Sequence, residues 1–163
     1  MSDPTEADLG ALIEALLDAE VRFAVVGGAA AILHGAPTST LDLDILVERS
    51  KENAERLARV AEELEATIRD ATERRLRPTR ALFETVRQLL LSTRLGPLDV
   101  LGELHDGRGL SEVMEATVVL EDGERRIRVI DLPTLLEIKS STGRTKDRLV
   151  VPLLLALLEE RET

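Results

Sequence analysis

Asp42 and Asp44 are the residues of this sequence whose type and spacing most clearly predict chemistry. They lie in the stretch Thr40-Leu41-Asp42-Leu43-Asp44-Ile45, where acidic and apolar residues alternate. Residues two apart on a β-strand project to the same face, so we expect both carboxylates on one face and Leu41 in the core on the other. Two neighbouring carboxylates repel each other, and a divalent cation removes that cost. Phosphoryl-transfer sites hold metal against triphosphate oxygens in this way.

A third acidic residue, Asp99, lies between Leu98 and Val100 in a short apolar stretch. We expect it on a strand beside the Asp42/Asp44 pair, where it would bind a second metal ion or deprotonate an acceptor hydroxyl. The alternative for these aspartates is a solvated strand edge, since the chain contains 31 acidic residues. The flanking apolar residues and the preceding Gly-Gly pair favour a metal site.

That glycine pair, Gly27-Gly28, follows a short apolar strand that we expect over Phe23–Val26. A tight strand-to-helix turn explains the pair simply. In addition, bare glycine backbone lets N–H groups and a helix N-terminus approach a phosphate closely. The pair is not the dinucleotide-binding fingerprint, because Gly27-Gly28-Ala29-Ala30 lacks the second and third glycines at the needed spacing.

A basic cluster, Lys139, Arg144 and Lys146, surrounds a turn at Gly143. Cations on a helix and the loop after it could reach triphosphate oxygens, with Asp147 orienting Arg144 or Lys146 through an ion pair. The alternative is a helix C-terminus with favourable cations and a glycine stop.

Two other polar features favour a structural role. His34 could donate to substrate, but on a short buried helix we expect a structural histidine with its hydrogen bonds satisfied. A run of four arginines is expected to form a solvated face or a patch for an anionic partner: Arg74, Arg75, Arg77 and Arg80.

The composition restricts the metal and the partners. There is no cysteine and there are only two histidines, so any metal should be an oxygen-preferring cation such as Mg²⁺ or Mn²⁺. The net charge of −10 and the two aromatic residues argue against broad nonspecific nucleic-acid binding. The longest apolar run, residues 149–158, is too short to cross a membrane, and the acidic N-terminus is unlike a signal peptide, so we expect a cytoplasmic location.

The elements that must position these residues are strands and helices of one expected domain, residues 1–163. Asp3-Pro4-Thr5-Glu6 predicts a capping box, and leucines at helical spacing follow it. Further helices are expected over residues 29–33 and 50–64, after Asp131 and at the C-terminal end. Strands are expected over 41–47, over 85–94 and 98–101 joined across Gly96-Pro97, and over 116–120 and 126–130 around Asp122-Gly123. Residues 67–80 have no clear pattern. This mixture predicts an α/β or α+β fold with a mixed sheet flanked by helices.

Together these motifs resemble the nucleotidyltransferase superfamily, which includes the polymerase-beta type of catalytic core. The residues that carry the resemblance are Val26 to Ala31, His34-Gly35, Thr40 to Ile45, Leu135 to Lys139, Gly143-Arg144 and Lys146-Asp147. They look like the small abortive-infection type found in bacterial toxin–antitoxin pairs. One departure is that members often carry an arginine shortly before Thr40, and Pro37-Thr38-Ser39 has none.

The resemblance implies a Mg²⁺-dependent enzyme that transfers a nucleoside monophosphate from an NTP to a hydroxyl of a tRNA, a protein or a small molecule. Asp42, Asp44 and Asp99 would be catalytic and bind metal. The nucleotide would lie against Gly27, Gly28, Thr40, Lys139, Arg144 and Lys146. The rival hypothesis is a catalytically silent relative that binds a partner protein, such as one encoded by a neighbouring gene. A third is a resistance enzyme acting on an aminoglycoside.

Overall fold

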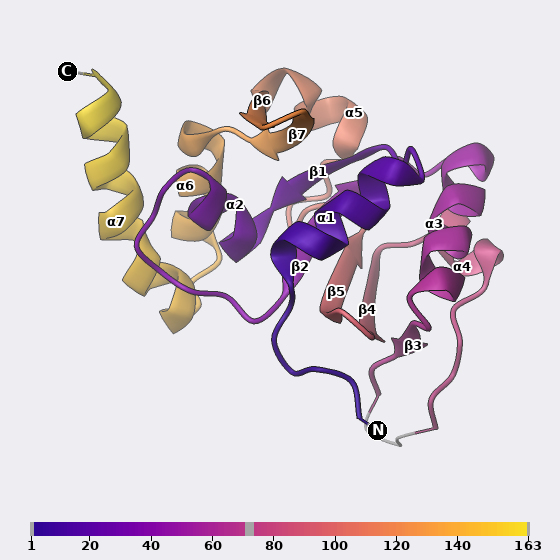
Figure 1. Cartoon of the computed structure of the whole chain (residues 1–163). Coiled ribbons are helices and arrows are strands. Elements are labelled where there is room, and N and C mark those ends of the chain that lie inside the picture. The colour runs from indigo at the N-terminus through magenta and orange to yellow at the C-terminus, as the bar shows by residue number, and fades with distance from the viewer. Residues whose placement is uncertain (1, 71–73, 163) are drawn as a thin grey trace.

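A computed structural model of the chain describes residues 2–70 and 74–162, and its centre is a seven-stranded mixed sheet. The strand order is β3-β4-β5-β2-β1-β7-β6, with parallel pairing between β1 and β7 and between β2 and β5. The strands are β1 (Phe23–Val26), β2 (Leu43–Val47), β3 (Thr67–Ile68), β4 (Gln88–Thr93), β5 (Gly96–Leu101), β6 (Thr117–Asp122) and β7 (Arg125–Ile130). The predicted mixed sheet flanked by helices is confirmed (Figure 1).

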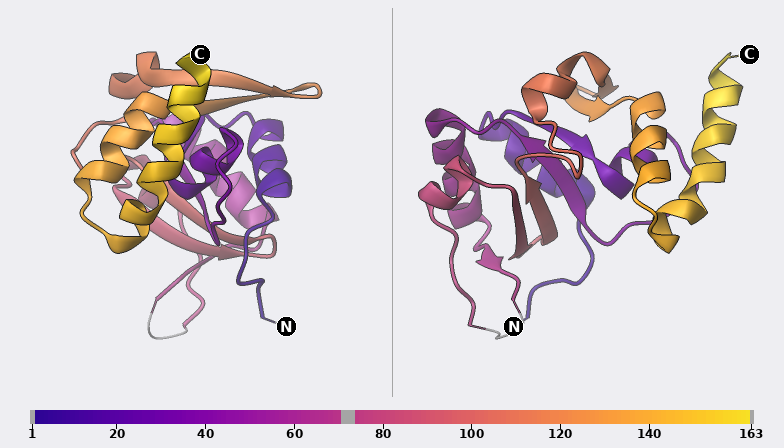
Figure 2. Two further views of the ribbon diagram at one scale, coloured as in Figure 1. Left: turned by 90° about the vertical axis from the view of Figure 1, so that its left-hand side faces the viewer. Right: turned by 180° about the vertical axis from the view of Figure 1, so that it is seen from behind.

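The helices lie on both sides of this sheet and at one of its ends (Figures 1 and 2). They are α1 (Leu9–Asp18), α2 (Gly27–Leu33), α3 (Lys51–Glu63), α4 (Arg80–Glu84), α5 (Leu110–Val113), α6 (Leu132–Ser141) and α7 (Thr145–Glu162), with a 3-10 turn, η1, at Met114–Ala116. Within the described part of the chain, no helix combines the length and the apolar character that a membrane span needs.

The central strands β1 and β2 form the core because their apolar side chains leave no exposed face. All four residues of β1 are buried, and Leu43, Ile45 and Leu46 of β2 are fully buried. The two strands pair antiparallel, which sets Val26 opposite Asp44. The end of β1 and the start of β2 therefore meet at the same place.

A buried asparagine fixes the other end of this strand pair. The Asn53 side chain at the start of α3 accepts a hydrogen bond from the backbone N–H of Arg22 at 2.7 Å. It also donates to the backbone carbonyls of Arg22 and Glu48, at 3.0 and 2.8 Å. These bonds satisfy buried backbone groups where β1 begins and β2 ends, so α3 holds the pair in register. Ser50 caps α3 as predicted.

The start of the first helix was predicted wrongly. Helix α1 begins at Leu9, and its cap is Asp8, whose side chain accepts from the N–H of Ala11, not the predicted Asp3. The preceding residues are held by tertiary contacts instead: the N–H of Ala7 donates to the carbonyl of Leu41 and that of Asp8 to the carbonyl of Leu95. These contacts outweigh the local capping signal.

The boundaries of several strands also differ from the prediction. Strand β2 begins at Leu43, and Leu41 is 58% exposed, so the expectation that it lies in the core is wrong. We predicted a strand over residues 85–94. The strand β4 covers only Gln88–Thr93, because the preceding segment turns into α4 to bury Phe83. The β4–β5 turn lies at residues 94–95, where the Thr93 hydroxyl accepts from the N–H of Leu95. The β6–β7 turn is Gly123-Glu124, one residue later than predicted.

Candidate functional site

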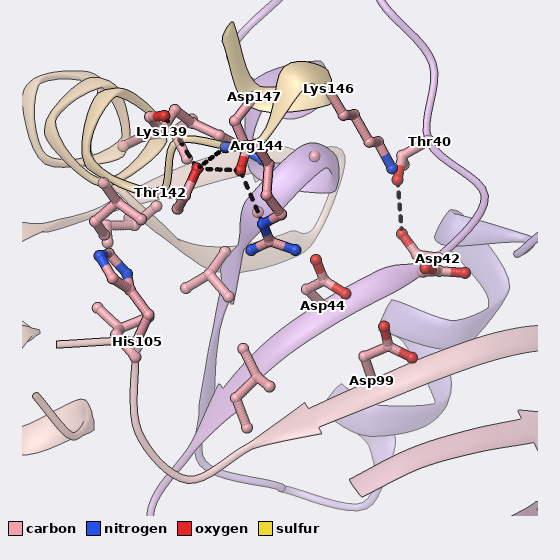
Figure 3. A pocket seen from close by; sticks show the side chains of 18 of the residues that line it. Thr40, Asp42, Asp44, Asp99, His105, Lys139, Thr142, Arg144, Lys146 and Asp147 are labelled. Atoms are coloured by element: carbon pink, nitrogen blue, oxygen red, sulfur yellow. Dashed lines mark hydrogen bonds and ion pairs between the residues drawn. The ribbon is translucent and has the colours of Figure 1, made fainter. Parts of the chain in front are cut away.

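The three predicted aspartates converge at the centre of the sheet. Asp44 of β2 and Asp99 of β5 are direct neighbours in the parallel register, and Asp42 lies in the bend before β2. One carboxylate oxygen from each lies within 4.8 Å of the other two (Figure 3). Three oxygens this close suit a divalent cation that prefers oxygen ligands.

The ionisation of Asp44 shows the cost of this arrangement. Burial, and after it the neighbouring charge of Asp42, raise the pKa of the Asp44 carboxyl to about 6. The cations Lys139, Lys146 and Arg144 act in the opposite direction. The cluster therefore carries excess negative charge around Asp44, which a bound cation would offset.

The glycine pair is required by these neighbours as well as by the turn. Gly27 has a positive φ of 65°, and a Cβ there would overlap Oδ2 of Asp44. A Cβ on Gly28 would lie 2.9 Å from the hydroxyl oxygen of Thr40. Helix α2 can thus begin directly against the carboxylates only because these two residues have no side chain.

The basic cluster forms the opposite wall of a cavity of about 200 Å³. All nine predicted site residues line this cavity: Gly27, Gly28, Thr40, Asp42, Asp44, Asp99, Lys139, Arg144 and Lys146. Figure 3 shows the Arg144 guanidinium directed toward Asp44, across the cavity from α6 and α7. The structure brings these residues together, and their chemical roles remain predictions.

Asp147 is the buried centre that holds two of the cations in place. Its carboxylate accepts from Nζ of Lys139 at 2.8 Å and lies 3.3 Å from Nε of Arg144. Burial alone would raise the pKa of Asp147, but the hydrogen bonds from Lys139 and Thr142 and the nearby positive charges hold it below its usual value. It was expected to form an ion pair with Arg144 or Lys146; it pairs with Arg144 and, at a shorter distance, with Lys139.

His34 is structural, as expected. Its ring is buried, with Nε2 2.7 Å from the carbonyl of Ile130 and Nδ1 3.2 Å from the Arg161 guanidinium. Burial lowers the pKa of His34, and these contacts suit the neutral tautomer protonated at Nε2. The ring therefore ties the end of α2 to β7 and α7.

The arginine run lies outside the cavity. Arg80 pairs with Glu84 at 3.1 Å, Arg74 with Asp70 at 3.5 Å and Arg75 with Asp3 at 3.9 Å, and the three arginine side chains are exposed. These pairs agree with the solvated face that we expected.

Sequence reasoning missed one cation at the centre of the site, Arg69. Its guanidinium pairs with Asp99 and lies 3.8 Å from Oδ1 of Asp42. Its buried Nε has no hydrogen-bond partner among the described residues. Arg69 follows the two-residue strand β3, in the stretch that had no clear pattern, so only the spatial order β3-β4-β5 could reveal it.

The cavity also has an apolar wall that the motifs did not indicate. Gln88 and His105 add polar groups to this wall. Its aliphatic side chains include Leu101, Leu104, Leu135 and Ile138. Nε2 of His105 lies 3.0 Å from the Ser141 hydroxyl. Asp42 also lines a second hollow, a groove along residues 2–5 and 67–70.

Comparison with solved structures places this architecture among known folds. A Thermotoga maritima protein assigned as a nucleotidyltransferase superposes over 91% of this chain and 90% of its own, with a TM-score of 0.56 and 18% identity. The lincosamide antibiotic adenylyltransferase LnuA, bound to lincomycin, superposes over 94% of this chain and 99% of its own. The TM-score is 0.65 and the sequence identity is 12%. ANT(2")-Ia, in complex with adenylyl-2"-tobramycin, superposes over 94% of this chain and 89% of its own. The TM-score is 0.59 and the sequence identity is 13%.

These likenesses show the nucleotidyltransferase fold, as the sequence motifs predicted. No family model and no curated protein sequence matches the chain. At 12–18% identity the comparisons establish the fold, and the activity has to be argued from the site.

The steric role of Gly27 gives a first prediction. Gly27→Ala should destabilise the protein by about 2–4 kcal/mol and displace Asp44, because it adds both backbone strain and an overlap with that carboxylate. Gly123→Ala is the matched control, with φ of 64° and nothing within 4 Å of its Cβ, and should cost about 1 kcal/mol. Urea unfolding measures both. Equal losses would show that only the backbone conformation matters.

The raised pKa of Asp44 gives a second prediction. Between about pH 4 and 6 the folded protein holds a proton on Asp44 that the unfolded chain has released, so this group's contribution to stability is lost as pH rises through 6. The unfolding free energies of the wild type and Asp44→Asn are measured with a metal chelator present. Because asparagine does not titrate, the variant should gain stability relative to the wild type as pH rises over this range, by about 1 kcal/mol after allowing for solvent screening. A difference that does not change with pH would contradict it.

Proposed function

We propose that this protein is a divalent-metal-dependent nucleotidyltransferase, which transfers a nucleoside monophosphate from an NTP to an acceptor hydroxyl. The observation that carries the proposal is the cluster of three carboxylates in a cavity with a basic wall, one of which, Asp42, also lines a separate groove. Asp42 lines both hollows, so two substrates can approach the same metal-binding oxygens from different sides.

The cavity suits the nucleotide. Lys139, Arg144 and Lys146 offer positive charge to the triphosphate, and Gly27 and Gly28 leave backbone exposed at its floor. Thr40 adds a hydroxyl beside Gly28. The apolar wall beyond Asp44 is suitable for the base or sugar of the NTP.

The carboxylates suit Mg²⁺ or Mn²⁺. The donor set is three oxygens from Asp42, Asp44 and Asp99, with the excess negative charge that the raised pKa of Asp44 reports. When bound, the metal supplies the charge that holds the phosphate oxygens and stabilises negative charge during transfer. Arg69 contacts two of these carboxylates. The Asp99 side chain is the less exposed of the two, with 13% of its surface accessible, and 31% of the Asp42 side chain is accessible.

The transfer itself balances as a substitution at the α-phosphorus of the NTP. The acceptor oxygen forms a bond to that phosphorus, the bond from the phosphorus to the bridging oxygen breaks, and pyrophosphate leaves. Attacking and leaving oxygens lie roughly in line in such reactions, which fits a nucleotide in the cavity and an acceptor in the groove. In this proposal Asp99 takes the proton of the acceptor hydroxyl, the role that the sequence motif suggested.

The compared adenylyltransferases bear on the class of acceptor. LnuA with lincomycin and ANT(2")-Ia with adenylyl-2"-tobramycin concern small molecules, which favours a small-molecule hydroxyl here. A tRNA or a protein hydroxyl, in a cytoplasmic toxin–antitoxin setting, is the other possibility that the sequence raised, and the experiment below separates these classes.

One observation favours the rival hypothesis of a silent, partner-binding relative. The Arg69 guanidinium already neutralises Asp42 and Asp99 in the absence of metal. If this cation has replaced the metal permanently, the carboxylates are structural. If it is a counter-ion of the resting site, metal displaces it.

These two cases predict different behaviour of Arg69→Gln. For the enzyme, removing the competing charge should strengthen Mn²⁺ binding without nucleotide by about tenfold. Arg108→Gln is the control, because Arg108 also has a buried nitrogen without a partner among the described residues but pairs with Asp106. Calorimetry of both variants measures the effect. Mn²⁺ binding by Arg69→Gln with none by the wild type, even with NTP, would favour the silent relative.

A transfer assay tests the proposed activity directly. Labelled NTPs are incubated with three separate pools: total tRNA, a protein extract, and aminoglycosides with lincosamides. Wild type should label one pool. Asp99→Asn should keep most of its NTP binding yet transfer about 10²–10⁴-fold more slowly, because Asp42 and Asp44 still hold metal while the proton acceptor is lost. The Asp42→Asn, Asp44→Asn double variant should lose both. No transfer to any pool, with metal and NTP bound, would count against the enzyme.

A further inference from the structure

Helix α7 has an outer face that no other part of the described chain covers. The helix lies at one extremity of the molecule beside α6, and its other side faces away from the sheet in every view (Figures 1 and 2). Its inward residues Asp147, Val150 and Leu154 are buried. The opposite face is therefore free to contact another molecule.

This outer face is apolar in the middle and charged at its ends. Arg148, Pro152, Leu155 and Glu159 follow one another at spacings of four, three and four residues, which places them in one row along the helix. Leu149 and Ala156, seven residues apart, flank this row. Leu149 is 74% exposed and Leu155 is 43% exposed. The face therefore presents apolar side chains to solvent, and a partner that covered them would gain hydrophobic stabilisation.

The two charges of the row have no use within the chain. In the ranges that the structure describes, neither the Arg148 nor the Glu159 side chain has an ion-pair or hydrogen-bond partner. Their order also opposes the helix dipole, which favours acidic groups at the N-terminal end and basic groups at the C-terminal end. Asp147 and Arg161 have the favourable order, but they point inward, to Lys139 and to His34. The outer charges thus suit an external partner better than the helix itself.

We propose that this face is a homodimer interface in which α7 pairs antiparallel with α7 of a second copy of the chain. A two-fold axis midway between Pro152 and Leu155 sets Arg148 opposite Glu159 of the partner subunit, and Pro152 opposite Leu155 of the partner subunit. Both ion pairs form at once, because a two-fold contact uses the same residues on each side.

The order of the charges along α7 favours a second copy of the chain as the partner and an antiparallel arrangement of the two helices. A row that is basic at one end and acidic at the other is complementary to itself only when reversed, whereas a parallel pair would bring like charges together. The contact of one helix pair is small, so association should be reversible and dependent on concentration. The proposal does not rest on the enzymatic one.

Sedimentation velocity at low salt, from about 5 to 500 µM protein, tests the association in the range expected of a small interface. The wild type should shift toward twice the mass of one chain as concentration rises. Leu155→Glu should remain monomeric. Leu82→Glu is the matched control, since Leu82 of α4 is 42% exposed and remote from α7, and it should dimerise like the wild type. Circular dichroism melts show whether both variants are folded.

A charge exchange tests the register. Arg148→Glu and Glu159→Arg, each alone, should weaken dimerisation about tenfold or more, although both changes suit the helix dipole better. Mixing the two variants, or combining both changes in one chain, should restore it. A wild type that is monomeric at every concentration would overturn the proposal, and so would a dimer that neither Leu155→Glu nor the charge variants weaken.

Discussion

The convergence of three carboxylates is the constraint on which the rest of this structure depends. Asp44 on β2, Asp99 on β5 and Asp42 in the bend before β2 offer oxygens within 4.8 Å of one another, and burial together with the charge of Asp42 raises the pKa of Asp44 to about 6. Such a cluster is stable only with positive charge nearby. The chain supplies it from two directions: Arg69 contacts two of the aspartates, and a basic wall held by Asp147 faces the third.

Strand pairing and close backbone packing position the three carboxylates. Antiparallel pairing sets the end of β1 against Asp44, and the absence of a side chain at Gly27 lets α2 begin there. Parallel pairing sets Asp99 beside Asp44. Asn53 fixes the far end of the same strands with three hydrogen bonds to backbone. Most of these contacts join residues distant in sequence, so the geometry of the site is a property of the packed sheet.

The sequence allowed much of this to be predicted, and the failures have one cause. The aspartates, the glycine pair and the cations on α6 and α7 were found because local spacing and flanking apolar residues mark them. Arg69 was missed because its neighbours carry no periodicity and its place depends on β3 pairing with β4. The wrong start of α1 and the exposure of Leu41 have the same origin, since one backbone bond, from Ala7 to Leu41, moves both segments from their local preference. Tertiary contacts of this kind leave no local signal.

The central claim is that Asp42, Asp44 and Asp99 hold a divalent cation whose place Arg69 occupies at rest. The most direct test is a crystal structure with Mn²⁺ and a non-hydrolysable NTP, with anomalous scattering used to locate the metal. We predict an anomalous peak among the three carboxylates, phosphate oxygens facing Lys139 and Arg144, and an Arg69 guanidinium that no longer contacts Asp42. Manganese bound elsewhere, with Arg69 still paired to both aspartates, would contradict the account.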